Sequence, residues 1–131
     1  MAHYIALVDG KPGAYGVVFP DASGCTAMGA THEEALRNAV LALSDWVGQD
    51  APPAARSIEA LRIDDEVREQ LEEGSVFAIV PLIQEKGRSV KANLSIDAGL
   101  LEAIDDAAGR AGLTRSAFLS SAAKDKIIES V

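Results

Sequence analysis

A short row of hydrogen-bonding side chains lies in the last third of the chain. Lys91, Asn93 and Ser95 are polar, and each is followed by an apolar residue. This alternation predicts a β-strand with one buried face and one free face. Lysine supplies ammonium donors, asparagine supplies a donor and an acceptor, and serine supplies a hydroxyl that can act as either. The free face would therefore form directional hydrogen bonds with a polar partner.

Two helices must position this strand. Gly112 is suited to a helix C-cap, and Thr114 is suited to cap the next helix. One strand and two helices in about 45 residues bury too small a core alone and leave a strand edge open. Pairing the strand with its copy from a second chain would solve both problems. The apolar stripes of the two helices comprise Leu100, Leu101, Ile104, Ala108 and Ala111, and then Phe118, Leu119, Ala122, Ala123 and Ile127.

This order of elements, with KANLSID followed by GLTRSAF, resembles the ribbon-helix-helix DNA-binding family. In that family, the outward residues of the paired strands enter the major groove and read base edges. The resemblance assigns Lys91, Asn93 and Ser95 to base reading. Lysine suits guanine acceptors, asparagine suits adenine, and serine suits either base. The alternative is an ordinary edge strand with solvated polar residues.

The start of the second helix is the expected contact with the DNA backbone. Unpaired N–H groups and the positive end of the helix dipole favour a phosphate there. Thr114, Arg115 and Ser116 are therefore assigned to phosphate contacts. Asp97 stands where family members often have proline. Aspartate can cap the first helix, and its charge should weaken DNA binding slightly.

Charge divides the chain into two parts. Residues 1–85 contain 5 Lys and Arg against 14 Asp and Glu, whereas residues 86–131 contain 7 against 6. The net charges are therefore −9 and +1, which add to the −8 of the whole chain. An acidic domain repels nucleic acid and attracts a basic partner. The two parts should thus have partners of different character.

The acidic part has the pattern of a βββα(α)β domain. Thr31 and Glu34 form a predicted capping box at the start of its first helix, whose apolar stripe includes Trp46. Val76–Ile83 is nearly continuously apolar, which predicts a strand covered on both faces. The expected elements are strands over 4–9, 14–19, 25–29 and 76–83 and helices over 31–48 and 64–73.

The stretch from YIALVDG to GATHEEAL resembles the N-terminal domain of HicB-type antitoxins. The resemblance implies a partial ribonuclease-H-like fold. It also implies that the domain binds a small, basic, HicA-type toxin that cleaves messenger RNA, and that an acidic surface covers the toxin's RNA-binding face. The residues that carry it are Phe19, Pro20, Asp21, Gly24, Cys25, Gly29, Thr31, Glu34, Ala35 and Leu36.

Four carboxylates are candidates for contact with the toxin by charge and position: Asp9, Asp21, Glu33 and Glu34. Ordinary structural roles compete with this assignment. Glu33 and Glu34 suit the first turn of any helix, because negative charge is favourable there. Asp21 suits the turn PDASG.

We expect no enzyme activity, cofactor or metal. Two-metal nuclease chemistry needs several carboxylates from different strands, and only Asp9 ends a strand convincingly. His3, Cys25 and His32 lack the paired spacing of a metal site, and neither histidine has an obvious partner for base catalysis. Cys25 is expected to be a small buried residue rather than a reactive thiol.

The chain is expected to be cytoplasmic. A single cysteine is compatible with a reducing compartment. The start MAHYIALVDG lacks the features of a signal peptide. No apolar stretch approaches the roughly 20 residues of a membrane span, so no membrane partner is expected.

The sequence therefore predicts an α+β chain. Residues 1–84 form the partial ribonuclease-H-like domain, 85–90 a linker, and 91–131 the ribbon-helix-helix (βαα) domain. The predicted protein is an antitoxin that neutralises a HicA-type toxin and represses its own operon at operator DNA, as a homodimer or homotetramer. Two alternatives remain: a solitary ribbon-helix-helix regulator whose first domain senses a small molecule, and an interaction module whose C-terminal part only dimerises.

Overall fold

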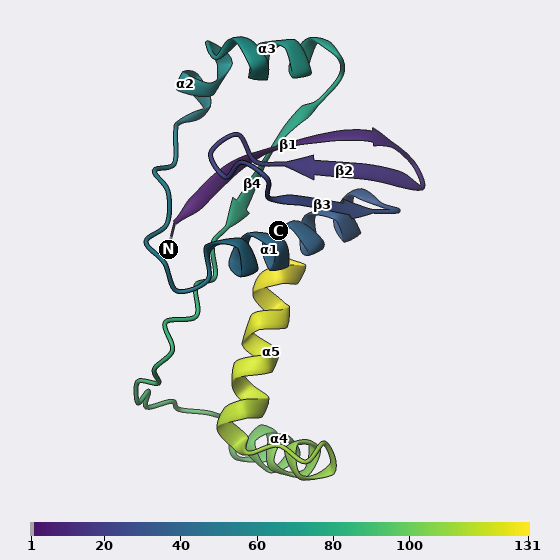
Figure 1. Ribbon diagram of the computed structural model, residues 1–131. Helices are drawn as coiled ribbons and strands as arrows, with labels where there is room; N and C mark the ends of the chain where they lie inside the picture. The colour runs from purple at the N-terminus through teal and green to yellow at the C-terminus, as the bar shows by residue number, and fades with distance from the viewer. Residues whose placement is uncertain (1) are drawn as a thin grey trace. The chain divides into compact units, whose positions relative to one another are not determined.

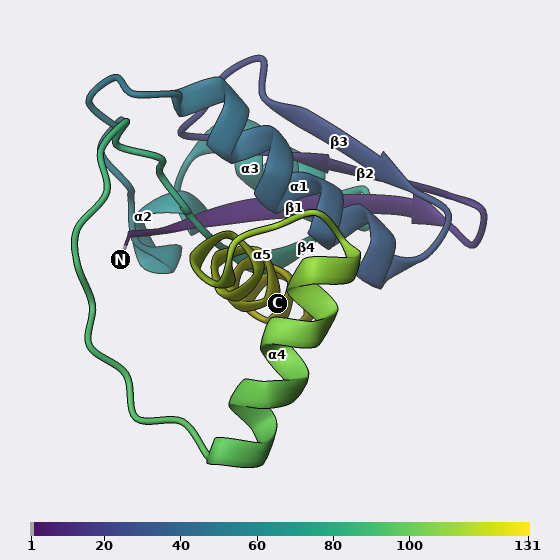
Figure 2. The ribbon, with the colours of Figure 1, turned by 90° about the horizontal axis from the view of Figure 1, so that it is seen from below.

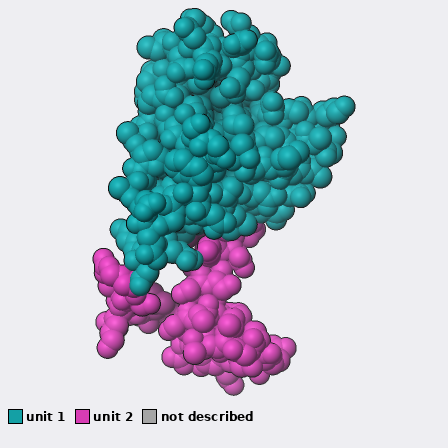
Figure 3. Space-filling view, in the orientation of Figure 1, with its two compact units in different colours: residues 1–87, 131 teal, residues 88–130 magenta. Residues whose placement is uncertain are grey.

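The computed structural model describes residues 2–131, which form a mixed α and β fold. In the described residues, three strands are followed by three helices, a fourth strand and two further helices, and the four strands form one antiparallel sheet. Two compact units divide it, the first ending at Gly87 and the second spanning Arg88–Ser130 (Figure 3). The predicted α+β class is thus confirmed.

The first unit is built on four antiparallel strands. The order in the sheet is β3-β2-β1-β4, so β1 lies inside the sheet and β4 lies at one edge. The end of the first strand, just before the turn into the second, requires glycine: Gly10 has a φ of +105°, and a Cβ there would lie 2.2 Å from the carbonyl oxygen of Ala14. The strands are β1 (His3–Lys11), β2 (Ala14–Val18), β3 (Thr26–Gly29) and β4 (Val76–Pro81).

Helix α1 (His32–Val47) covers one face of this sheet (Figure 1). Thr31 caps it by accepting a hydrogen bond from the backbone N–H of Glu34 at 3.1 Å, which confirms the N-cap half of the predicted capping box. Ala39, Val40 and Leu43 are fully buried against the sheet. Gly29 allows the helix to approach β3, since a Cβ there would lie 2.4 Å from the backbone nitrogen of Ala35.

Two short helices lie on the opposite face (Figures 1 and 2). They are α2 (Ile58–Arg62) and α3 (Asp65–Glu72). Leu61 and Val67 from these helices pack on Leu7 of β1. Helix α3 was predicted from the sequence, whereas α2 was not, because five residues are too few to show helical periodicity.

Two sequence-based expectations are wrong. The last strand ends at Pro81 rather than Ile83, and it is not covered on both faces, since Val76 on one face is 48% exposed and Ile79 on the other is 55% exposed. It also lies at an edge of the sheet. Trp46 does not join the buried stripe of α1, since it is 44% exposed. An apolar run in the sequence shows only which residue types are present. Whether they are buried depends on which elements pack against the strand or helix.

The second unit contains α4 (Ala98–Arg110) and α5 (Arg115–Glu129). The predicted caps are confirmed: Asp97 accepts from the N–H of Leu100, and Thr114 accepts from the N–H of Ala117, each at 3.1 Å. Gly112, with a φ of +70°, ends α4 in a Schellman motif in which the N–H of Leu113 donates to the carbonyl of Ala108.

The segment 88–97, which precedes α4, is in neither helix nor strand. A strand is defined by its hydrogen-bonded neighbour, and the predicted neighbour is a second copy of the chain, so the paired ribbon stays a prediction. Many apolar side chains of this unit are exposed to solvent in the single chain. They are Val90 (81%), Leu94 (66%), Leu100 (56%), Leu113 (43%) and Ile127 (38%).

The close approach of α1 to β3 gives a stability prediction. Gly29→Ala should cost about 3 kcal/mol, since the new methyl group meets backbone atoms that cannot rotate away. Gly13→Ala is the control: its Cβ would meet nothing within 4 Å, and only its φ of +95° opposes it. That change should cost about 1 kcal/mol. Urea unfolding of both variants checks the order, and equal losses would contradict the close approach.

Candidate functional site

The three residues predicted to read bases lie in the unpaired segment before α4. Lys91, Asn93 and Ser95 are all exposed to solvent. The apolar residues between them are exposed as well, with Leu94 at 66%. The single chain therefore leaves both the polar and the apolar side of this segment open.

Hollows separate this segment from the first turns of α5. One of about 570 Å³ is lined by Leu94, Ile96 and Leu119 together with Arg115. Another, of about 780 Å³, is lined by Asn93 and Leu119 among others. The apolar side chains that line these two hollows stay in contact with water until another surface packs against them.

The structure gives the residues predicted to contact phosphate a more specific arrangement. Thr114 is the N-cap of α5, and Arg115 and Ser116 form its first turn. The guanidinium of Arg115 donates two hydrogen bonds to the carboxylate of Asp105 in α4, from Nε at 2.9 Å and from Nη2 at 2.8 Å. This bidentate pair lowers the pKa of Asp105 and ties the two helices together.

The four candidate carboxylates of the first unit do not form one cluster. Asp9 is exposed on β1, on the sheet face opposite α1, as its register beside Leu7 requires. Glu33 and Glu34 lie in the first turn of α1. Asp21 has a side chain only 10% exposed and is used inside the unit.

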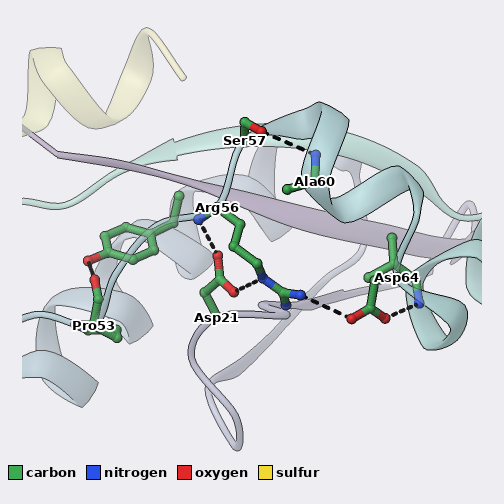
Figure 4. A network of polar contacts seen from close by, with 8 residues as sticks. Asp21, Pro53, Arg56, Ser57, Ala60 and Asp64 are labelled. Carbon is green, nitrogen blue, oxygen red and sulfur yellow. Dashed lines mark hydrogen bonds and ion pairs between the residues drawn. The ribbon is translucent and has the colours of Figure 1, made fainter.

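Arg56 is the partner of Asp21 and the centre of a polar network (Figure 4). Its Nε donates to Oδ1 of Asp21 at 2.6 Å, its backbone N–H donates to Oδ2 at 2.7 Å, and its Nη1 donates to Asp64 at 3.0 Å. Asp64 in turn caps α3 through the N–H of Val67. Close by, the hydroxyl of Tyr4 donates to the carbonyl of Pro53. The network holds the chain between α1 and α3 against the loop after β2.

Sequence reasoning did not identify Arg56. Its signal was available, since Arg56 is the only charged residue between Asp50 and Glu59, in a stretch that is otherwise alanine, proline, serine and isoleucine. A lone cation in such a segment is suited to an internal ion pair. What the sequence could not show is that its partner lies 35 residues away, in the PDASG turn.

The groups considered for catalysis have ordinary structural surroundings. Cys25 is buried, as predicted, and burial raises the pKa of its thiol, which disfavours the nucleophilic thiolate. The ring of His32 packs edge-on against Tyr15 with centroids 4.7 Å apart. Within residues 2–131, no three His, Cys, Asp or Glu side chains gather as a set of metal ligands. None of the helices described is long and apolar enough to cross a membrane.

The family model for the HicB-like antitoxins of bacterial toxin–antitoxin systems matches residues 3–123. The chain belongs to this family. Because the match extends into both compact units, the sequence resemblance to HicB antitoxins is confirmed, and an antitoxin role follows. Comparison with curated proteins gives no match.

Solved structures agree with the family. The crystal structure of the Burkholderia pseudomallei antitoxin HicB is 27% identical, with a TM-score of 0.55 over 96% of this chain and 98% of that one. The N-terminal domain of that antitoxin is 25% identical, with a TM-score of 0.51 over 63% of this chain and 99% of that one. A HicA3 and HicB3 toxin–antitoxin complex matches with a TM-score of 0.50 and 22% identity over 63% and 99%, which shows the fold alone.

The Arg56 network gives a pH prediction. The N–H of Val67 and then Arg56 lower the pKa of Asp64, so its charged form stabilises the fold. That stabilisation is present above the unfolded pKa of about 3.9 and is lost as pH falls through the lower folded value. Asp64→Asn should therefore be less stable than the wild type at pH 7, and the difference should shrink as the pH falls below about 3.9. Urea unfolding across this range checks it, with Asp65→Asn as the control for losing one charge in the same turn. A difference in stability that stays constant as the pH falls would contradict the assignment.

Proposed function

We propose that this antitoxin neutralises a small, basic, messenger-RNA-cleaving toxin of the HicA type and represses its own operon. The first unit, with a partial ribonuclease-H-like fold, would bind the toxin. The second would pair with a second copy to form a DNA-binding ribbon-helix-helix. The observation that carries this proposal is the family match through both units, which joins an acidic sheet domain to a near-neutral helical one.

Charge supports the toxin-binding half. Residues 1–85 carry a net charge of −9, and residues 64–73 alone contain six carboxylates and one arginine. Such a surface attracts a basic protein from a distance and raises the rate of encounter. A toxin that grips RNA must itself be basic, so the acidic unit competes with RNA for the same surface.

Exposed apolar groups support the DNA-binding half. Leu94 and Val90 lie on a segment whose backbone is in neither helix nor strand, and hollows lie between this segment and α5. A second copy that pairs its own segment antiparallel to this one would give the backbone N–H and C=O groups hydrogen-bond partners and would cover the apolar side chains. A homodimer is thus the minimum unit for DNA binding.

The outward side chains of the paired segment would then read bases. Lys91, Asn93 and Ser95 would face the major groove, and the free N–H groups at the start of α5 would hold a phosphate. Arg115 has a double role in this proposal. Asp105 engages two of the five N–H donors of its guanidinium, and the remaining donors can contact the DNA backbone.

The toxin half is tested by copurification with the tagged full-length chain from its native cells. A stoichiometric small basic protein, toxic when expressed alone and harmless beside the antitoxin, is the expected result. If no such protein copurifies while the chain still binds its own promoter, the antitoxin proposal fails, and a solitary regulator becomes the better description.

The DNA half predicts two distinct mutational effects. Asn93→Ala should cost about 1–3 kcal/mol on operator DNA and relax the preference at one base position. Arg115→Ala should weaken binding to every DNA sequence alike and reduce the salt dependence by about one charge. Fluorescence anisotropy on operator and random duplexes separates the two. Equal losses on both duplexes for both variants would remove the base-reading assignment.

A further inference from the structure

Helices α2 and α3 cover only half of their sheet face. They pack over β1 and β4, where Leu7, Leu61 and Val67 are buried. The half of the face made by β2 and β3 is open: Val18 is 39% exposed and Met28 is 69% exposed. Strand register places both on the α3 side, since Val18 pairs with Leu7, and Met28 pairs with Gly16 next to it.

This open half carries the exposed apolar side chains of Val18 and Met28 beside the exposed Thr26, which pairs with Val18. The carboxylate of Asp9 reaches over Gly16, since its Oδ1 lies 3.1 Å from the position of a Cβ there. Gly16 lies between Asp9 and Met28 in the sheet and adds no side chain. On the other sheet face, Ala6, Val8 and Val17 are buried on the side of α1, and Val76 at the edge is 48% exposed. When a folded chain leaves apolar side chains exposed together on a sheet, another molecule often covers them.

A groove of about 250 Å³ continues this open half beneath α3. Its floor is apolar, with Leu7, Val18 and Phe19, and its wall is formed by α3. The Arg56 network fixes this wall, because Asp64 both caps α3 and pairs with Arg56. The groove can therefore receive an apolar side chain of a partner without rearrangement of the sheet.

Carboxylates stand at both ends of this open half. Glu66 lines the groove, and Asp9 lies at the far end in the row of Gly16 and Met28. Both are exposed, and neither forms an ion pair within residues 2–131. Arg56, which pairs with Asp64, also lines the groove, and Lys11 lies on the same face of β1 as Asp9. The exposed apolar side chains with Glu66 and Asp9 beside them are complementary to a surface that has an apolar side chain flanked by lysine or arginine.

We propose that the strip formed by Val18, Gly16 and Met28, with the groove beneath α3, is the docking surface for the basic toxin. This inference rests on the proposed function and locates its contact. The toxin inserts an apolar side chain into the groove and places cations near Glu66 and Asp9. Of the four carboxylates that the sequence offered, only Asp9 takes part. A second acidic copy is disfavoured here, since the same anions would face each other.

The test measures the affinity of the full-length antitoxin for the toxin that copurifies with it. Met28→Ala should weaken binding about tenfold, as expected for an apolar anchor at an interface. Glu66→Gln should weaken it several-fold and reduce its dependence on salt. Leu41→Ala and Asp45→Asn are the matched controls, since both change exposed residues of α1, outside the strip, and should leave the affinity unchanged.

The outcomes are distinguishable. If the wild type binds the toxin and Met28→Ala and Glu66→Gln bind it equally well, the docking surface is wrong and the antitoxin function stands. If the wild type binds no toxin, the proposed function itself fails. A lower oligomeric mass for Met28→Ala, with unchanged toxin affinity, assigns the strip to a second copy and overturns the proposal. Because Met28 is 69% exposed, its variant should fold, and thermal unfolding by circular dichroism verifies this.

Discussion

The contact between Arg56 and its two aspartates determines the architecture of the first unit. One guanidinium joins the loop after β2, the chain that leaves α1, and the cap of α3. Each of these segments is too short to be stable alone, and α2 and α3 together bury few residues. An ion pair with a nearly buried partner, supported by a backbone N–H, orients them more strongly than a solvent-exposed pair could. Together with the packing of Leu61 and Val67 on Leu7, this contact holds α3 over β1.

The two units differ in how far they bury their apolar side chains within the single chain. In the first, a sheet with helices on both faces buries its own core, and most of its acidic side chains are exposed at the surface. In the second, two well-capped helices leave their apolar groups in solvent. Local capping is therefore complete where tertiary burial is not. A helix pair of this kind is preorganised for association, because its backbone conformation is already fixed before a partner arrives.

The sequence predicted those features that local chemistry determines. Thr31, Asp97 and Thr114 cap helices as expected, and Gly112 ends one, because each acts on N–H or carbonyl groups within a few residues. Features set by distant neighbours were missed or mistaken. Trp46 has an apolar side chain but is 44% exposed, β4 has an apolar sequence but exposed residues on it, and the pairing of Asp21 with Arg56 was not foreseen. The family relationship could be predicted because its residues occur in order along the chain.

The proposed pairing of residues 88–97 between two chains would link repression to the abundance of the protein. If the base-reading surface forms only when two such segments join, it belongs to no single chain. At low concentration, the number of complete surfaces rises as the square of the number of chains, so halving the supply removes about three quarters of them. Repression of the operon would then decrease more steeply than the concentration of the antitoxin. Transcription would resume while some antitoxin is still present.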